Sequence, residues 1–258
     1  MDLRSILDAF ASGSLSLEEA EKRVSIHAIE KLGEMAKLDV GREVRRGMPE
    51  IILAESKQYG DIIRIATAVV RKNGQVVISR VRKNHLGKIS NQLRKKGFAV
   101  EVGKNSTTMQ VTAKSFRRNN GGFTVGIVAA GTSDIGVAEE ARIVAEAMGG
   151  TAVVSYDVGI AGMHRLFPEL KEMIDRKVGA IVVVAGMEGA LASVVASMVD
   201  VPVVGVPTSV GYGFGANGVA ALASMLQSCT MGLAVVNIDN GVGAGAYAAS
   251  IARKKMKR

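Results

Sequence analysis

The chain contains no tryptophan, four prolines and one cysteine, and aromatic residues make up only 4% of its 258 residues. Its core must therefore be built from Val, Ala, Ile, Leu and Met, which suits parallel α/β layers better than aromatic-rich β sandwiches. A single cysteine excludes an internal disulfide. No apolar run approaches the roughly 18 residues of a membrane span. The N-terminal MDLRSILDAF also lacks the basic start and apolar stretch of a signal peptide. We therefore expect a soluble cytoplasmic protein without a membrane partner.

Charge is distributed unevenly between the two halves. Residues 1–120 carry 23 Lys and Arg against 13 Asp and Glu, a net charge of +10, whereas residues 121–258 carry 10 against 11, a net charge of −1. The basic excess has three interpretations: an ordinary solvated surface, an electrostatic field that attracts a polyphosphate substrate, or a surface that binds nucleic acid. Its charge runs, Lys83–His85 and Arg94–Lys96, lack the interleaved aromatics that base stacking uses. Nucleic acid is therefore not an expected partner.

The first half is predicted to be a small α/β domain, residues 1–120, ending in a polar linker. Predicted helices are Leu3–Phe10, Leu17–Lys37, Asp61–Lys72 and Asn84–Lys96, and predicted strands are Ile51–Ala54, Gln75–Val81, Phe98–Val102 and Thr107–Thr112. Arg42, Arg45 and Arg46 precede the turn at Gly47 and are either phosphate ligands or an exposed basic turn.

The second half, residues 121–258, alternates short apolar strands with helices. Predicted strands are Thr124–Ala129, Thr151–Ser155, Gly179–Val184, Val201–Val206 and Leu233–Val236, and predicted helices are Ile135–Met148, Met163–Lys177, Gly189–Met198, Ala216–Ser228 and Ala244–Arg253. Near-continuous apolar strands in repeated βα units predict a doubly wound parallel sheet.

Ligands of such sheets bind beyond the carboxyl ends of the strands, an edge that we call the rim. Every predicted strand delivers small or polar residues there: Gly131-Thr132-Ser133-Asp134, Tyr156–Gly159, Ala185-Gly186-Met187-Glu188, Pro207-Thr208-Ser209 and Asn237–Asn240. The first of these groups opens a helix, where aligned N–H groups favour a phosphate or carboxylate. The alternative is a turn that only caps the helix.

Asp157 and Glu188 follow different strands, so they are predicted to face one site, where they bind Mg²⁺, hold ribose hydroxyls or act as acid and base. Helix capping is the alternative for Asp157. His164 and Arg165 open the next helix and are candidates for anion binding or proton transfer.

Cys229 is predicted to lie at the C-terminal end of a helix, between Ser228 and Thr230. A negative helix end and apolar neighbours both raise a thiol pKa, so local sequence predicts an inert core cysteine. A cationic ligand beside the sulfur would reverse this expectation.

The Gly131–Asp134 turn, the His164–Arg165 pair and the Pro207–Thr208 rim resemble those of the PurE superfamily of aminoimidazole ribonucleotide carboxylases and mutases. The chain departs from PurE in two places. GMEGAL replaces a His-Leu-Pro-Gly turn after the third strand, and the segment that leads to His164, YDVGIAGMHR, also differs. Both departures match a narrower family, the LarB carboxylases of nickel-pincer cofactor biosynthesis. The resemblance covers about residues 40 to 250, through GMPEIILAESK, AAGTSDI, DVGIAGMHRL, VVAGMEGALASVV, PVVGVPTSVGYG, SCTMG and VNIDNGVGAG, with Gly136 and Ala192 where proline is expected.

The resemblance implies a PurE/flavodoxin-like fold. It also implies carboxylation of the pyridinium ring of nicotinic acid adenine dinucleotide at C5, with cleavage of the phosphoanhydride. The products are pyridinium-3,5-biscarboxylate mononucleotide and AMP, and CO₂ or bicarbonate is the co-substrate. The family's cysteine, which adds to ring C4, falls on Cys229. Addition of a thiolate removes the positive charge and makes C5 nucleophilic.

Further roles are expected on the same basis. Glu188 or Asp157 handles protons, Thr132, Ser133 and Asp134 hold ribose or phosphate, and His164 and Arg165 hold a carboxylate or phosphate. Arg46 and Lys57 reach the second phosphate, and Mg²⁺ assists anhydride cleavage. A homo-oligomer, an octamer, is implied. Two alternatives remain: an imidazole ribonucleotide carboxylase, which does not need Cys229, and a non-catalytic nucleotide- or RNA-binding module.

Overall fold

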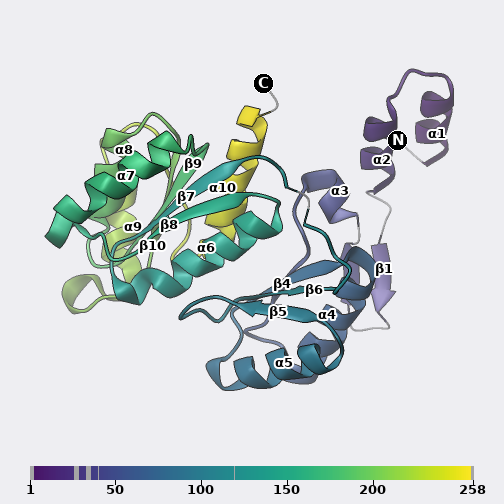
Figure 1. The fold of residues 1–258 in the computed structure, drawn as a ribbon, viewed down its shortest axis with the longest axis horizontal. Helices are drawn as coiled ribbons and strands as arrows, with labels where there is room; N and C mark the ends of the chain where they lie inside the picture. Colours follow the sequence, from purple (N-terminus) through teal and green to yellow (C-terminus); the bar gives the residue numbers. More distant parts are fainter. Residues whose placement is uncertain (1–2, 26–28, 33–35, 40, 119, 257–258) are drawn as a thin grey trace. The chain divides into compact units, whose positions relative to one another are not determined.

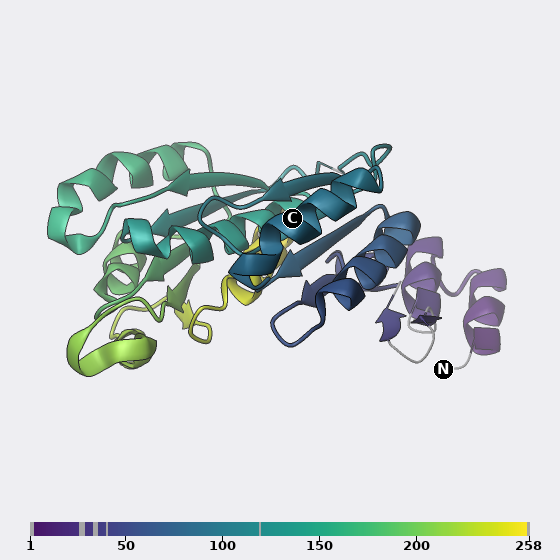
Figure 2. The same ribbon diagram turned by 90° about the horizontal axis from the view of Figure 1, so that it is seen from below.

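A computed structural model describes residues 3–25, 29–32, 36–39, 41–118 and 120–256. The chain divides into two compact units, residues 1–101 with 110–116, and residues 102–109 with 117–258. Figures 1 and 2 show the elements of each unit from two directions. The segment 102–109, which the sequence placed in the first domain, belongs to the second unit.

The first unit is built around a four-stranded sheet of order β3-β4-β6-β5. Its elements are α1 (Leu3–Ala11), α2 (Leu17–Val24), β1 (Ile29–Leu32), β2 (Ala36–Asp39), α3 (Arg42–Arg46), β3 (Ile51–Leu53), α4 (Tyr59–Asn73), β4 (Gln75–Ser79), α5 (Lys83–Lys95), β5 (Ala99–Val102) and β6 (Met109–Thr112). Buried Val and Ile side chains of α4 and β4 form its core, including Val69, Val70 and Ile78.

The predicted helix Leu17–Lys37 is wrong beyond its first two turns. A capping box between Ser16 and Glu19 starts α2 as expected, but the helix ends at Val24. The antiparallel pair β1 and β2 follows, with Ile29 opposite Asp39. Residues 26–28 and 33–35 of the predicted helix lie outside the described residues. The helical spacing of apolar residues continues through this stretch and led to the prediction of one long helix. That spacing carries no information on which segments pair as strands, so the pairing of β1 with β2 could not be predicted from it.

The second unit contains a five-stranded sheet of order β11-β10-β9-β7-β8. Its elements are β7 (Thr124–Ala129), η2 (Thr132–Asp134), α6 (Ile135–Ala147), β8 (Thr151–Ser155), η3 (Ile160–Arg165), α7 (Leu166–Asp175), β9 (Ala180–Ala185), α8 (Ala190–Met198), β10 (Val203–Pro207), η4 (Gly213–Gly218), α9 (Val219–Leu226), β11 (Leu233–Val235) and α10 (Gly241–Met256). All strand pairs are parallel. Read from β8, the order is the 2-1-3-4-5 of flavodoxin-like folds, which confirms the predicted fold class.

Helices cover both faces of this sheet. Figure 1 shows α7 and α8 on one side and α6 on the other. On the first side, Leu170 and Met173 of α7 and Val195 of α8 join one buried apolar cluster with β9. On the other side α10 packs closely against α6. A Cβ at Gly245 of α10 would lie 2.4 Å from the Ala141 carbonyl oxygen of α6, so this close packing requires glycine.

The predicted strands agree with the structure, with β7 and β8 at the predicted residues and the others within two residues at either end. Two predicted helices differ at their starts. Met163–Lys177 begins with the 3₁₀ turns of η3 before α7, and Ala216–Ser228 is divided between η4 and α9. Among the described residues, no helix combines the length and apolarity needed to cross a membrane.

Candidate active site

The turn after β7 is organised around the buried carboxylate of Asp134. This side chain is 4% exposed and accepts hydrogen bonds from the Gly131 N–H at 2.9 Å and the Thr208 hydroxyl at 2.7 Å. Burial raises the pKa of Asp134, against the lowering effect of these hydrogen bonds. Asp134 therefore ties the turn after β7 to the turn after β10. Thr132 and Ser133, between Gly131 and Asp134, are exposed and free to face a ligand.

The turn after β9 passes close beneath the turn after β10. A Cβ at Gly186 would lie 2.3 Å from the Val210 carbonyl oxygen and 2.7 Å from the Thr208 hydroxyl oxygen. The Met187 N–H donates to the same Val210 carbonyl at 3.2 Å. Met187 and Glu188 are exposed, and Met187 has a positive φ of 50°. Glycine at 186 thus permits a close approach that leaves the next two side chains at the rim.

A cavity of about 280 Å³ opens between these turns. Its apolar wall includes Ala130, Ile160 and Leu191, and its polar lining includes Ser133, Asp134 and Glu188. The cavity lies between the carboxyl ends of β7 and β9, the neighbouring strands from which the chain winds in opposite directions, where doubly wound folds bind ligands. An apolar pocket with few polar groups suits a small ring, and its volume is below that of a whole dinucleotide site.

The turn after β8 holds an ion pair. Asp157, with a positive φ of 59°, accepts a hydrogen bond at 2.6 Å from Arg165. Both side chains are about half exposed, at 50% and 43%, so this pair contributes little to stability. His164 is exposed beside it. Asp157 is thus engaged by Arg165 and is not part of the cavity lining, whereas Glu188 is.

Beneath this turn, α6 carries two buried acids. Glu139 accepts hydrogen bonds from Arg142, the Tyr156 hydroxyl and the Lys104 N–H. Burial alone would raise its pKa, but these donors together lower it. Glu140 accepts from the Thr108 hydroxyl at 2.8 Å and the Val242 N–H at 3.2 Å. The two carboxylates fasten the segment 103–108 and the start of α10 to α6. This role was not among the predictions, although two adjacent acids on an apolar helix face are its signal in the sequence.

The same segment explains one mismatch with the resembled family. Gly136 stands where proline was expected, and a Cβ at this position would lie 2.6 Å from the Asn105 carbonyl oxygen. The segment 103–108 therefore requires glycine there.

Groups of three or more His, Cys, Asp or Glu side chains that suit a metal ion are absent from the described residues. Near the rim, Ser209 is exposed and its N–H donates to Asp239 at 2.8 Å, so Asp239 is partly used by the backbone. Magnesium in nucleotide enzymes is usually held by one or two carboxylates together with substrate phosphates. The side chains that the structure describes do not by themselves form a magnesium site.

Cys229 lies in the loop from the end of α9 to the start of β11 and is exposed. The prediction of a core cysteine is therefore wrong. The adjacent Ser228 hydroxyl accepts hydrogen bonds from Ser193 at 2.8 Å and from the Thr230 N–H at 3.2 Å, which holds the loop against α8. Leu233, four residues later, pairs with Val203 at the amino end of β10. Cys229 thus precedes the amino end of β11, whereas the Ser133–Asp134 turn follows the carboxyl end of β7.

The basic residues of the first unit are partly engaged. Arg45 forms a two-pronged contact with Asp39 at 3.1 and 2.6 Å, and Arg42 lies 3.3 Å from Glu50. These contacts favour a structural role for two of the three arginines. Arg46 ends α3, and Lys57 follows β3 in a turn closed by its N–H to the Ala54 carbonyl.

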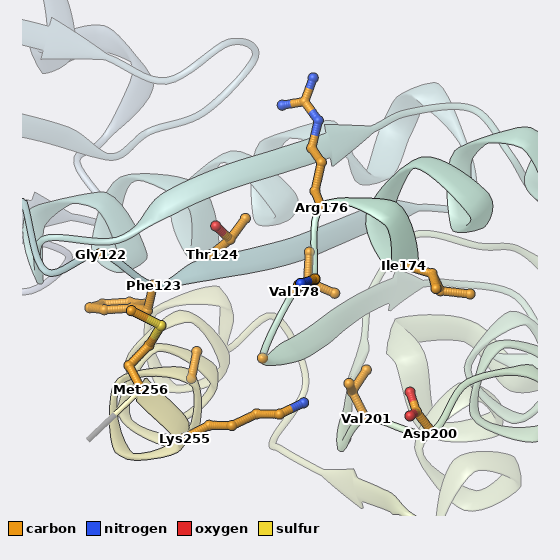
Figure 3. A pocket seen from close by; sticks show the side chains of 13 residues that line it. Gly122, Phe123, Thr124, Ile174, Arg176, Val178, Asp200, Val201, Lys255 and Met256 are labelled. Atoms are coloured by element: carbon orange, nitrogen blue, oxygen red, sulfur yellow. The ribbon is translucent and has the colours of Figure 1, made fainter. Parts of the chain in front are cut away.

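A larger cavity, about 560 Å³, lies at the amino ends of β7 and β9. Figure 3 shows Lys255 extending from α10 towards Val201, with Phe123 and Met256 at one end. This cavity contains none of the predicted site residues and lies at the edge opposite the rim, so the smaller cavity is the candidate active site.

Comparison with known proteins agrees with this geometry. Residues 124–258 match the AIR carboxylase family, and residues 29–112 match the LarB/PurE-like N-terminal domain. The chain belongs to the LarB family of the PurE superfamily. This LarB-family chain is 46% identical to an uncharacterised protein of Methanocaldococcus jannaschii over 255 residues, 98% of this chain and 97% of the relative. It is 33% identical over 132 residues to an N5-carboxyaminoimidazole ribonucleotide mutase of Thermotoga maritima, 49% of this chain and 73% of the mutase. A mutase of the same name from M. jannaschii is 33% identical over 128 residues, 48% of this chain and 76% of the mutase.

The match to the PurE superfamily identifies the second unit as an enzyme of carboxylase or mutase type. In this unit Ser133, Glu188 and the buried Asp134 line one cavity at the rim, which is the candidate active site.

Proposed function

We propose that this enzyme carboxylates the pyridinium ring of nicotinic acid adenine dinucleotide at C5 and cleaves its phosphoanhydride. The products are pyridinium-3,5-biscarboxylate mononucleotide and AMP. The observation that carries the proposal is the presence, on one chain, of a LarB-type N-terminal domain and a PurE-type unit whose single thiol is exposed.

The chemistry follows from the charge of the ring. A pyridinium carbon is electrophilic and does not attack CO₂. When the Cys229 thiolate bonds to C4, the ring nitrogen regains its electron pair and C5 becomes an enamine carbon. C5 then forms a bond to CO₂, a base removes the C5 proton, and the C4–S bond breaks to restore the aromatic ring and the thiolate. The net change replaces a hydrogen by a carboxylate and releases one proton. Water then adds to a phosphorus of the anhydride and AMP leaves.

The rim supports the binding half of this scheme. The exposed Thr132 and Ser133 precede α6, where hydroxyl and N–H donors suit a ribose phosphate. The 280 Å³ cavity suits a ring and its sugar rather than a whole dinucleotide. Glu188, exposed at the cavity wall, is our candidate for the base that removes the C5 proton.

A second candidate is an aminoimidazole ribonucleotide mutase or carboxylase. It is favoured by the 33% identity, over about half of this chain, to two N5-carboxyaminoimidazole ribonucleotide mutases. That chemistry needs no thiol, because an aminoimidazole ring is already nucleophilic.

The two candidates are separated by Cys229→Ser. The wild-type protein, the variant and the surface control Lys171→Ala are incubated with the dinucleotide and ¹³C-bicarbonate, and products and intact protein are analysed by mass spectrometry. We expect labelled biscarboxylate mononucleotide, AMP and a protein–dinucleotide adduct from the wild type and the control, and none of them from Cys229→Ser. Turnover of an aminoimidazole ribonucleotide by Cys229→Ser, with no reaction of the dinucleotide in any sample, would replace this proposal by the second candidate.

A further inference from the structure

The larger cavity of the second unit is a separate space from the candidate active site. Its volume is about 560 Å³, and it lies where β7 and β9 begin, whereas the rim lies where these strands end. The six residues of β7 span roughly 17 Å at about 3.3 Å per residue. A ligand held at the rim therefore leaves this cavity unfilled, and a cavity of this size accommodates a small molecule.

The apolar walls of this cavity are fixed by close backbone packing. The Phe123 side chain is 2% exposed and lies between two glycines, since a Cβ at Gly121 or Gly150 would lie 2.7 or 2.4 Å from its ring. On the opposite wall, a Cβ at Gly179 would lie 2.6 Å from the Ala252 Cα, so the start of β9 touches α10. The apolar lining as a whole is Phe123, Ile174, Val178, Val201, Ala252 and Met256.

Basic residues of the second unit are concentrated around this cavity. Seven of the ten Lys and Arg in residues 121–258 occur at positions 176–177 and 253–258. Three of them, Arg176, Lys177 and Lys255, line the cavity, and Asp200 is the one acid in its lining. Because residues 121–258 carry a net charge of −1, this edge has a local positive field on a nearly neutral background, and such a field attracts anions.

Two of these cations have no counter-ion. Lys177 and Lys255 form no ion pair with a residue that the structure describes, whereas Arg176 lies 2.8 Å from Glu172. Figure 3 shows Lys255 extending from α10 towards Val201, so its charge lies on the side of the cavity. The three basic residues elsewhere in 121–258 are all paired: Arg142 with Glu139, Arg165 with Asp157 and Lys171 with Asp175.

These features together favour one class of ligand. Three basic side chains disfavour a metal cation, and an inorganic anion such as phosphate has no apolar part to lie against the walls. An anion that carries an apolar ring suits both the walls and the charge, because buried apolar area and charge-assisted hydrogen bonds both contribute to its binding. A nucleoside monophosphate has such a ring, a sugar and a charged phosphate, and a cavity of about 560 Å³ is large enough for it.

We infer that this cavity is a second ligand site, which binds a nucleoside monophosphate. The base lies at the end formed by Phe123 and Met256, and the phosphate is bound by Lys177 and Lys255. The site is independent of the rim and of the reaction proposed there, because it shares no lining residue with the cavity at the rim.

Methionine methyl NMR tests the inference, because each cavity has one methionine in its lining, Met256 here and Met187 at the rim. The full chain is labelled with ¹³C at the methionine methyl groups, and Met256→Leu and Met187→Leu assign the two signals. Titration with AMP is expected to shift the Met256 signal saturably. Adenosine and inorganic phosphate, each of which lacks one part of the ligand, are expected to bind at least about ten-fold more weakly.

The double variant Lys177→Ala, Lys255→Ala is expected to weaken the AMP titration at Met256 by about ten-fold or more. Both lysines are exposed, so the melting curve should remain that of the wild type. The matched control Lys171→Ala, Lys254→Ala removes the same charge outside the cavity and should keep the wild-type affinity.

Four results would overturn the inference. They are an AMP-induced shift at Met187 without one at Met256, equal affinities for AMP and adenosine, equal weakening by the double variant and its control, and a Met256 signal that responds to an RNA oligonucleotide or to anionic lipid vesicles but not to AMP.

Discussion

The substitution Thr208→Val tests whether the buried hydrogen bond to Asp134 holds the rim together. Valine keeps the β-branched shape of this fully buried side chain but removes the hydroxyl that donates to Asp134 at 2.7 Å. A hydrogen bond to a charged group contributes about 1.5–3 kcal/mol. We expect a loss of about 2 kcal/mol in the free energy of unfolding at pH 7.5, or roughly 4–8 °C in melting temperature.

The sign of the pH dependence follows from Asp134. Its pKa is raised in the folded protein, so its contribution to stability is complete below the unfolded pKa and is lost as pH rises through the folded pKa. The Thr208 hydroxyl opposes this rise, so Thr208→Val raises the folded pKa of Asp134 further. The cost of Thr208→Val should therefore be larger at pH 7.5 than at pH 3.5, because the lower pH favours the protonated carboxyl in both proteins.

Urea unfolding at these two pH values measures the effect, in the wild-type background and with Asp134→Asn. The double-mutant cycle isolates the coupling between residues 134 and 208. A coupling energy near zero at pH 7.5, or an equal cost at both pH values, would refute the assignment of this bond as the link between the two turns.

Two further substitutions examine neighbouring contacts. Gly186→Ala places a Cβ 2.3 Å from the Val210 carbonyl and is expected to cost about 1–3 kcal/mol in urea unfolding. Gly60→Ala, a helical position with nothing within 4 Å, is its control and should stabilise by about 0.5–1 kcal/mol; equal effects would show that the turn after β9 has room. Tyr156→Phe removes the hydroxyl that donates a hydrogen bond to Glu139. The pKa of Glu139 is lowered in the folded protein, so its contribution to stability is present above pH 4.5 and is lost as pH falls through the folded pKa. Acid titration of unfolding should show a smaller loss for this variant than for the wild type, and an unchanged profile would contradict the role of the hydroxyl.

Much of the second unit was predictable from sequence, because its strands are apolar runs bounded by glycine or polar residues. β7 and β8 occur at the predicted residues, and the rim followed from the rule for parallel sheets. The first unit was less predictable. The helix predicted from Leu17 gives way to β1 and β2, whose pairing depends on contacts that spacing does not encode.

The candidate site was predictable as a set of turns but not as a set of contacts. Asp134 was expected to face ligand, and the structure shows it buried against Thr208, which is 74 residues away. Cys229 was expected in the core on the strength of its apolar neighbours, and it is exposed. Neither outcome follows from local sequence, because burial of a single side chain depends on which distant segments cover it.

The interleaving of the two units limits how the gene can be divided. The segment between β5 and β6 belongs to the second unit. Within it the Lys104 N–H donates to Glu139 and the Thr108 hydroxyl donates to Glu140. A truncated protein starting at residue 117 would leave these two acids without those donors inside an apolar helix face. A cut at residue 117 thus removes part of the second unit, and expression of residues 117–258 alone would require redesign of that helix face.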